Sequence, residues 1–569
     1  MQIQQDAQAV EWWKEAVVYQ IYPKSFYDSN NDGTGDIRGI IEKLPYLHEL
    51  GISMIWLSPF YQSPMADNGY DISDYFAVNA DLGEMRDIDE LITRAKNYGI
   101  HIMIDLVVNH TSDEHPWFRE AVNNPQSPYR NYYIFKAGKN GGAPNNWRSL
   151  FGGSAWQKLP DEDNYYLHVF HQKQPDLNWE NPALREDIYA MVNWWLAKGI
   201  AGFRIDAITF IKKDRDFSSC PADGSDGLVS IKVKSRNRPG IETFLHELKA
   251  KTFDRFRCVT VGEAPGVPFD QYANYIGAEG YFNMIFDFHA ADIDVENGSE
   301  WFRRHNWTVD EFRRTLFASQ QAFVRAGWGT TFIENHDQPR ALSKLIKDVR
   351  YQNATGAKAL AAMYFFMFGT PFIYQGQELR MANFCRQDIS EFDDVSSIDN
   401  YHRSLAEGFT APQAMHFVNQ RSRDNARTPF HWADTLNAGF NTGATPWLAF
   451  SSADYTVNAA SQLNDADSVF SFYKKMIRLR NKCWPETLIY GEFIPLDFPD
   501  ENIIAYERKS RTDRFISITN LSNKTIPFIL PQGDVLLNNY DCLTSEIQPY
   551  QTIFIKGHFK NEQIQRDCR

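Results

Sequence analysis

Two acidic residues end apolar runs that have the character of buried β-strands. Asp206 ends GFRID, Glu263 ends TVGE, and Arg204 lies two residues before Asp206. Alternate residues of a strand share one face, so Arg204 and Asp206 point the same way. Neighbouring strands lie about 4.8 Å apart, and a glycosidase that retains configuration needs its two carboxyls about 5 to 5.5 Å apart. The residues predict such a site, with acids merely neutralised by Arg204 as the alternative.

Two further apolar runs end in polar residues. Asn109 and His110 end DLVVNH, and His336 and Asp337 end FIENHD. A lone His usually satisfies a local hydrogen bond, and a lone Asp usually caps a turn. Four strands that all end in polar groups are better explained by one shared site.

Eight apolar runs of this kind recur along the first 380 residues, with helical patterns between them. They start at Val17, Ile52, Ile100, Phe203, Cys258, Phe282, Thr331 and Phe372. Their near-continuous apolar character is typical of strands buried on both faces. The pattern predicts an α/β fold, a (β/α)8 TIM barrel, whose reactive groups sit at the C-terminal ends of the strands.

The remaining segments indicate two additions to the barrel. Residues 111–179 are too long for a strand-to-helix connection and predict an inserted subdomain after the third strand. The barrel itself is then expected over 12–110 and 180–490. Short alternating strands from 491–569 predict a C-terminal antiparallel β-sandwich. An irregular stretch over 381–450 is expected to cover the barrel mouth.

Composition and charge narrow the partners. The 569 residues include 58 Lys and Arg against 72 Asp and Glu, a formal charge of −14 that disfavours nucleic acid and anionic lipid. Aromatics at 15% favour a neutral polar ligand such as a sugar. The apolar window 359–374 is broken by Gly369 and Pro371, so no membrane span is expected. The chain as given begins with no signal-peptide pattern. We expect a soluble monomer and leave open whether it is secreted or cytoplasmic.

The segment DSNNDGTGD, residues 28–36, has the spacing of a calcium loop. It places oxygen-bearing side chains at alternate positions around a turn at Gly33. The segment predicts a structural Ca²⁺ site, with Mg²⁺ or a metal-free Asx turn as alternatives. Its candidate ligands are Asp28, Asn30, Asp32, the Thr34 carbonyl and Asp36.

DLVVNH, GFRIDA, GEAPG and FIENHD resemble, in the right order, the four consensus blocks of the α-amylase superfamily, glycoside hydrolase family thirteen, and QPDLNW at residues 174–179 resembles the fifth. The likeness covers about residues 12 to 560 and is to the α-glucosidase, oligo-1,6-glucosidase and sucrose isomerase branch. It implies that Asp206 is the nucleophile, that Glu263 is the general acid and base, and that Asp337 binds and distorts the sugar. His110 and His336 resemble the donors that hold sugar hydroxyls. We expect the nucleophile to stay ionised beside Arg204 and the acid to have a raised pKa.

The resemblance extends to the closed end of a glucose pocket. In ADNGYDISDY, Asp67 and Tyr70 match residues of that end, and Arg423 matches the partner of Asp67. This pair would restrict the enzyme to one terminal glucose, making it exo-acting. Phe151, Phe170 and Gln174 match pocket-wall positions, with plain core packing as the alternative. The family often binds Ca²⁺ or Mg²⁺ in the loop described above, and no organic cofactor is implied.

Segments such as YLHVFHQKQPDLNW resemble bacterial sucrose isomerases. The matching stretch 290–294, AADID, lacks both arginines that hold fructose in those enzymes, and the second clamp aromatic beside Phe286 is replaced by Pro265. Ser396 stands where the isomerases have Glu, and Ile208 stands where related enzymes select the linkage. We therefore expect a retaining α-glucosidase that hydrolyses sucrose, with weaker action on maltose-like α-glucosides. A sucrose isomerase or transglucosidase, and a non-catalytic binding protein of the same fold, remain as alternatives.

Overall fold

An eight-stranded parallel barrel forms the centre of the molecule. The computed structural model describes residues 11–296, 298, 300–450 and 457–558. The strands pair in the order β13-β12-β10-β5-β2-β1-β15-β14, and the Thr330 hydroxyl donates to the Ile285 carbonyl at 3.0 Å where β14 meets β13. The strands are β1 (Val18–Ile21), β2 (Met54–Leu57), β5 (His101–Val107), β10 (Gly202–Asp206), β12 (Val259–Glu263), β13 (Met284–Phe286), β14 (Thr330–Thr331) and β15 (Thr370–Tyr374). The predicted TIM barrel is confirmed.

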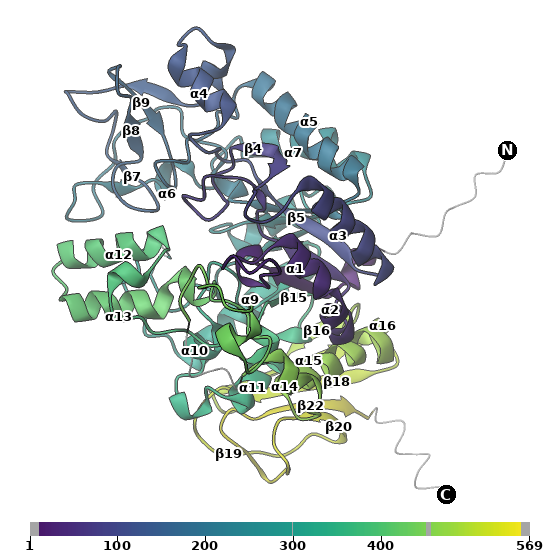
Figure 1. Cartoon of the computed structure of the whole chain (residues 1–569). Helices are drawn as coiled ribbons and strands as arrows, with labels where there is room; N and C mark the ends of the chain where they lie inside the picture. Colours follow the sequence, from purple (N-terminus) through teal and green to yellow (C-terminus); the bar gives the residue numbers. More distant parts are fainter. Residues whose placement is uncertain (1–10, 297, 299, 451–456, 559–569) are drawn as a thin grey trace, which may run out of the picture.

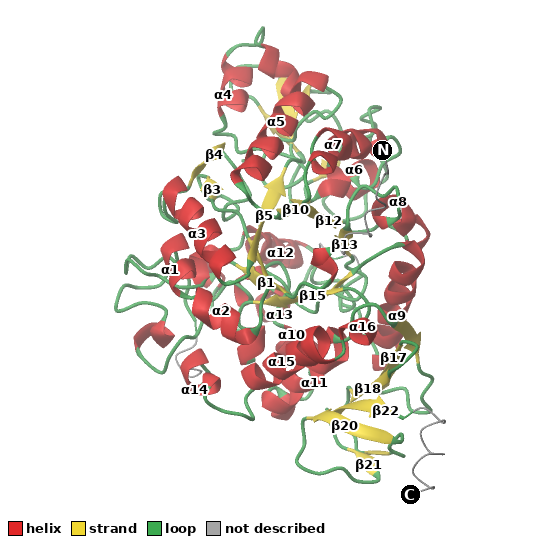
Figure 2. Ribbon diagram, turned by 90° about the vertical axis from the view of Figure 1, so that its right-hand side faces the viewer, coloured by secondary structure: helices red, strands yellow, loops and turns green. Residues whose placement is uncertain are grey.

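Helices surround the barrel on the outside (Figure 2). Capping residues mark their ends. For example, α5 starts after the N-cap Asn181, whose side chain accepts a hydrogen bond from the Ala183 amide, and ends at the C-cap Gly199, which has a φ of 104°. The helices are α1 (Ile37–Glu42), α2 (Leu44–Leu50), α3 (Met85–Asn97), α5 (Pro182–Lys198), α7 (Ile241–Lys251), α8 (Tyr272–Ile276), α9 (Val309–Ala326), α10 (Ala341–Leu345), α11 (Ala354–Phe365), α14 (Ala459–Leu463), α15 (Val469–Arg478) and α16 (Pro485–Leu488). None of the helices within the described ranges has the length and apolar character needed to cross a bilayer.

The seventh strand is shorter than its sequence predicts. The run TFIEN was expected to be a strand, but β14 ends at Thr331. Glu334 lies beyond it with its carboxylate bound by Arg340 at 3.2 Å and by the backbone amide of Ala341. The polar residues of this segment therefore shape a loop at the barrel mouth.

An additional layer lies over one side of the barrel mouth and appears at the top of Figure 1. It contains α4 (Pro116–Asn123) and an antiparallel sheet of β6 (Phe135–Ala137), β8 (Trp156–Lys158) and β9 (Asn164–Leu167). Its strand β7 (Trp147–Arg148) pairs with β11 (Val229–Ser230) from the loop after β10. That loop, which also holds α6 (Lys232–Ser235), therefore extends the subdomain expected over 111–179.

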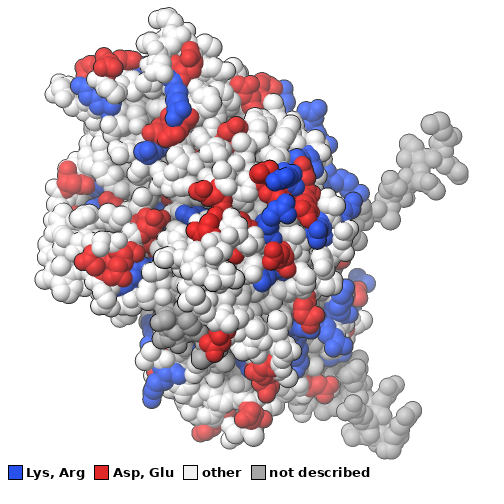
Figure 3. Space-filling model, viewed as in Figure 1, with Lys and Arg blue, Asp and Glu red and all other residues white. Residues whose placement is uncertain are grey.

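Other loops complete the molecule. The short strands β3 (Tyr61–Gln62) and β4 (Asp74–Val78) pair after β2. The segment expected to cover the mouth contains α12 (Val395–Ala406) and α13 (Ala411–Arg421), which lie beside the subdomain in Figure 1. On the face in Figure 3, acidic and basic side chains are interspersed.

The C-terminal region is an antiparallel β domain packed at the end of the barrel away from the subdomain (Figure 1). Isoleucines and Phe528 form an apolar cluster shared by its two sheets. The larger sheet has the order β16-β17-β18-β22-β20, and β19 pairs with β21. The strands are β16 (Glu492–Pro495), β17 (Ile503–Lys509), β18 (Arg514–Asn520), β19 (Ile526–Pro527), β20 (Gly533–Asn538), β21 (Glu546–Ile547) and β22 (Thr552–Gly557).

Candidate active site

One guanidinium holds the two acids that end β10 and β12. Arg204 Nη1 lies 2.6 Å from Asp206 Oδ1, and Arg204 Nη2 lies 2.9 Å from Glu263 Oε2. Ile205 pairs with Gly262 across the two strands, so the same register sets Asp206 level with Glu263. Ala207, at a φ of 43°, donates its amide to Glu263 Oε2 at 2.8 Å. The strand ends and this turn therefore fix the two carboxylates beside each other.

The electrostatics of this pair differ from the sequence-based expectation. Burial raises the pKa of Asp206 well above its usual range; Arg204 opposes the rise, while Glu263 and Asp105 add to it. The fold therefore raises the pKa of Asp206, which the sequence led us to expect to be an ordinary ionised carboxylate. The physical reason is that Asp206 is 8% exposed and faces other carboxylates. Positive charge developing on a bound sugar would relieve the repulsion among these groups.

Asp337 follows β14 and is strongly held as a carboxylate. Its Oδ2 lies 3.0 Å from His336 Nε2, and its Oδ1 lies 2.9 Å from Arg427 Nη2 and 3.4 Å from Arg423 Nη1. Burial alone would raise its pKa, but these three neighbours hold it well below the usual range. Gln20 donates its amide to His336 Nδ1 at 2.7 Å, which leaves Nε2 of His336 to carry a hydrogen toward Asp337.

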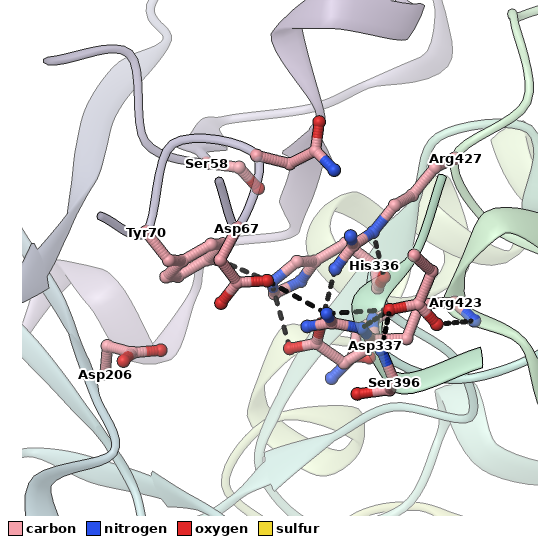
Figure 4. Close-up of polar contacts among 12 residues, drawn as sticks. Ser58, Asp67, Tyr70, Asp206, His336, Asp337, Ser396, Arg423 and Arg427 are labelled. Atoms are coloured by element: carbon pink, nitrogen blue, oxygen red, sulfur yellow. Dashed lines mark hydrogen bonds and ion pairs between the residues drawn. The ribbon is translucent and has the colours of Figure 1, made fainter. Parts of the chain in front are cut away.

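A second ion pair closes one end of the pocket. Arg423 Nη2 lies 2.9 Å from Asp67 Oδ1 and 2.8 Å from Asp394 Oδ1. Figure 4 shows Asp67, Asp337 and Arg423 gathered on one side of the site, with Asp206 on the other. The paired side chains leave an end wall made of buried charged groups.

Polar and aromatic side chains form the walls next to this end. Gln174 Nε2 lies 3.1 Å from both Asp67 Oδ2 and His110 Nε2, and burial lowers the pKa of His110 to about 3, so this ring is neutral. The Phe170 ring lies 5.3 Å from the His110 ring and 5.6 Å from the Phe151 ring. Because Phe151 and Phe170 line the cavity, they are wall residues as well as packing residues.

The cavity that these groups enclose has a volume of about 760 Å³. It brings together most of the predicted site residues. Tyr70 OH hydrogen-bonds His336 Nε2 and donates to Asp105 Oδ2 at 3.2 Å. Arg204 and His336 lie directly behind the lining residues, through the contacts given above. The predicted residues on the cavity wall are Asp67, Tyr70, His110, Phe151, Phe170, Asp206, Glu263, Asp337 and Arg423.

Sequence reasoning missed several residues that support the site. Asp105, in the middle of β5, is fully buried and lies 2.7 Å from Arg204 Nη1; Trp56 Nε1 donates to it at 2.9 Å. Asp394 and Arg427 hold Arg423 and Asp337 in the same way. An acid inside an otherwise apolar strand was the available signal for Asp105, since buried charges are normally paired.

Two residue assignments for the leaving-sugar side need correction. Phe286 lies in the barrel core, 1% exposed, with its ring 4.7 Å from that of Phe372, and Phe288 lines the cavity instead. The end of the strand explains the difference: Phe286 is the last residue of β13, so Phe288 lies in the following loop, where the alternation of the strand no longer sets its direction. Ile208 is also fully buried, and Ala207 is the residue after the nucleophile position that reaches the cavity.

The loop 28–36 is organised by its own hydrogen bonds. Asp28 accepts from the backbone amides of Asn31 at 2.7 Å and Gly33 at 2.8 Å, and Asn441 donates to it at 2.9 Å. Asp36 caps α1 by accepting from the Gly39 amide at 2.6 Å. Asn30, Asp32 and Thr34 add further oxygens, so the donor set suits Ca²⁺. Among the residues that the structure describes, however, no group of three or more Asp, Glu, His or Cys side chains is arranged so that it could hold a metal ion.

Comparison with known proteins identifies the family. The family model described as "Alpha amylase, catalytic domain" matches residues 20–491. The oligo-1,6-glucosidase of Parageobacillus thermoglucosidasius is 42% identical over 93% of this chain and 95% of its own. The trehalose-6-phosphate hydrolase of Bacillus subtilis (strain 168) is 39% identical over 95% and 97%. The crystal structure of isomaltulose synthase (PalI) from Klebsiella sp. LX3 superposes with a TM-score of 0.90 at 39% identity, covering 96% of this chain and 99% of that one. This chain belongs to the α-amylase family, glycoside hydrolase family thirteen, in its α-glucosidase and sucrose isomerase branch.

Proposed function

We propose that this α-glucosidase is a retaining, exo-acting enzyme that hydrolyses sucrose to glucose and fructose, with weaker action on maltose-like α-glucosides. One observation carries the mechanism: Arg204 contacts Asp206 at 2.6 Å and Glu263 at 2.9 Å on adjacent strand ends of one cavity. A retaining reaction requires two carboxyls about 5 to 5.5 Å apart, one to attack and one to protonate. A single guanidinium that contacts both carboxylates, on paired strands, supports this arrangement.

Asp206 is the nucleophile in this proposal. Its carboxylate attacks the anomeric carbon, the bond from that carbon to the leaving oxygen breaks, and Glu263 gives its proton to that oxygen. A water molecule then gives a proton to Glu263 and attacks the same carbon, which breaks the ester to Asp206 and releases glucose with retained configuration. Asp337, held as a carboxylate, binds the sugar hydroxyls and stabilises positive charge on the ring.

The closed end of the cavity supports exo action. Arg423 bridges Asp67 and Asp394 at 2.9 and 2.8 Å, so a chain of further sugars has no path beyond the terminal glucose. Pro265 and Phe288 also line the cavity, and we place the leaving sugar beside them. An enzyme with this shape cleaves one glucose from the end of its substrate.

Hydrolysis rather than isomerisation is supported by the groups around the leaving sugar. Ala290 and Ile293 stand in AADID where the isomerases carry arginines, and Ser396 and Pro265 line the cavity. Fewer groups would hold released fructose, so water would intercept the glucosyl ester more often. One observation favours the isomerase alternative, since Phe288 offers one aromatic face to the leaving sugar.

The test is to incubate the enzyme with sucrose, isomaltose and maltose and to separate the products. We expect glucose and fructose from sucrose, at a higher kcat/KM than for the other two sugars. A product mixture dominated by isomaltulose and trehalulose would establish the isomerase alternative. Faster cleavage of isomaltose or maltose would leave the mechanism intact and overturn the sucrose preference.

We also propose that the loop 28–36 binds a structural Ca²⁺ ion. Its support is the set of oxygen donors from Asp28, Asn30, Asp32, the Thr34 carbonyl and Asp36 within one turn. The bound ion would stabilise the loop against residues 440–445, where Asn31 already accepts from the amides of Thr442 and Ala444 at 3.1 Å. The ion takes no part in the proposed chemistry.

A further inference from the structure

Two basic side chains line the cavity outside the predicted glucosyl site. The carboxylates of Asp67, Asp206, Glu263 and Asp337 belong to that site. The lining also includes Lys232 from α6 and Arg236, which directly follows that helix, together with the acids Asp292 and Glu296. A cation on this wall that lacks an acidic partner would suit a negative charge on the leaving sugar.

Arg236 lies directly beside the segment that carries the proposed acid. Its guanidinium packs against Gly266, three residues after Glu263: a Cβ built on Gly266 would lie 2.6 Å from Arg236 Cζ. Gly266 has a φ of 71°, and its lack of a side chain makes this close approach possible. Among the residues that the structure describes, the Arg236 side chain has no hydrogen bond or ion pair.

Two acids near this wall, Asp292 and Asp294, already have cationic partners. Arg421 Nη2 lies 3.0 Å from Asp292 Oδ1, and Gln338 donates to the same oxygen at 3.2 Å. Asp294 is held by Arg421 at 2.7 Å and by Arg304 at 2.9 Å. Asp292 and Asp294 therefore pair with Arg421 and Arg304, and neither forms an ion pair with Arg236 within the described ranges.

Lys232 and Arg236 thus lie on the same cavity wall, and both side chains are largely removed from water. Burial and, next, the charge of Arg236 lower the pKa of Lys232 to about 8, while Glu300 and Asp292 oppose the effect. Burial also lowers the pKa of Arg236, with Asp292 only partly opposing the effect. Placing like charges together out of water is unfavourable, and an anion bound between them would remove that cost.

We propose that Arg236, with Lys232 beside it, binds a phosphate monoester on the leaving sugar, so that the preferred substrates are α-glucosides phosphorylated on the sugar that departs. This inference rests on the proposed function, because it needs glucose in the closed end and the leaving sugar at Arg236. A guanidinium is well matched to phosphate, which it binds through two parallel hydrogen bonds. A similar protein, 39% identical, is named as a trehalose-6-phosphate hydrolase.

The test compares each phosphorylated sugar with its neutral parent. The probes are sucrose 6′-phosphate, with phosphate on fructose, against sucrose, and trehalose 6-phosphate against trehalose. We expect a higher kcat/KM for the phosphorylated member of at least one pair. Arg236→Gln should lower that preference about tenfold or more, the effect of losing one charged hydrogen bond, and Arg236→Lys should recover part of it. Sucrose phosphorylated on glucose should be rejected, because the closed end is acidic.

Lys234→Gln, on the helix that Arg236 directly follows, is the matched control. Lys234 pairs with Asp216 at 2.9 Å and is absent from the cavity wall, so its substitution should leave the preference at the wild-type value. The proposal is overturned if Arg236→Gln and Lys234→Gln show the same preference as wild type, or if wild type prefers the neutral sugars.

A binding measurement separates this proposal from the proposed function. Calorimetric titration of Asp206→Asn with trehalose 6-phosphate and with trehalose needs no turnover. Tighter binding of the phosphorylated sugar, lost in a double variant with Arg236→Gln, supports the phosphate site even if neutral α-glucosides prove to be poor substrates. Equal binding of both sugars in an enzyme that cleaves sucrose rejects the phosphate site alone.

Discussion

Replacing Glu263 by Gln should shift the acidic limb of the pH–activity profile in a direction that the structure fixes. Glutamine keeps the size of the side chain, which accepts from Arg204 at 2.9 Å and from the Ala207 amide at 2.8 Å, and removes its charge. With α-glucosyl fluoride as substrate, the leaving group departs without a proton. The first chemical step then needs only the ionised carboxylate of Asp206.

The magnitude follows from the proximity of the two carboxylates. After burial, Glu263 is the first of three carboxylates that raise the pKa of Asp206, the others being Asp105 and Asp337. At about 4.8 Å and an effective dielectric constant of about 20, two unit charges repel by about 3.5 kcal/mol. This value is a ceiling, because Arg204 contacts both groups. Removing the charge of Glu263 therefore lowers the pKa of Asp206.

The sign of the effect on activity is then determined. In wild type, kcat/KM falls as the pH falls through the raised pKa of Asp206, since the protonated carboxyl does not attack. In Glu263→Gln, the same fall should occur at a lower pH. The assay measures kcat/KM for α-glucosyl fluoride across the pH range in both proteins.

The control is Glu247→Gln, which neutralises an acid that pairs with Arg185 at 3.0 Å outside the site. Its profile should coincide with that of wild type. An acidic limb of Glu263→Gln at the same pH as in wild type, or at a higher pH, would show that the charge of Glu263 does not raise the pKa of Asp206.

Three more predictions concern stability and the closed end of the pocket. Glu378 is fully buried and accepts hydrogen bonds from the hydroxyls of Tyr19 and Tyr46, each at 2.7 Å. Burial raises the pKa of Glu378 to about 7. The contribution of the protonated side chain to the free energy of unfolding is complete below the ordinary pKa of Glu and is lost as the pH rises through about 7. Glu378→Gln should therefore be more stable than wild type at pH 8, by about 3 kcal/mol, and the difference in Tm should vanish at pH 4; a Tm difference that does not change with pH would contradict this. A chelator should lower the Tm, and added Ca²⁺ should restore it, in wild type but not in Asp28→Asn; an unchanged wild-type Tm would exclude a structural ion. Arg423→Lys should lower kcat/KM for sucrose about tenfold or more, because an ammonium cannot reproduce the two-sided contacts of the guanidinium, and wild-type kinetics would show that this end does not bind glucose.

The barrel and its reactive edge were predictable because strand character and strand ends are local properties. Asp206 and Glu263 each stand at the last residue of an apolar run, and the structure ends β10 and β12 at those residues. The alternation within a run was less certain. Phe286 and Phe288 differ by two positions, and only the end of β13 decides that the first packs in the barrel and the second reaches the cavity.

Contacts between distant segments could not be predicted in the same way. Asp105 and Arg204 lie 99 positions apart in the sequence and meet only because β5 and β10 are neighbours. Arg236 reaches the cavity because the loop after β10 joins the inserted subdomain through β11. No local pattern in the sequence marks such a loop as part of the site.

The central claim is that Asp206 forms a covalent bond to glucose. The most direct measurement is inactivation by 5-fluoro-α-D-glucosyl fluoride, followed by mass spectrometry of peptides from the labelled enzyme. We expect one fluoroglucosyl group, carried by the peptide that contains Asp206 and absent from Asp206→Asn. A label on another carboxylate, or turnover without any covalent species, would contradict it.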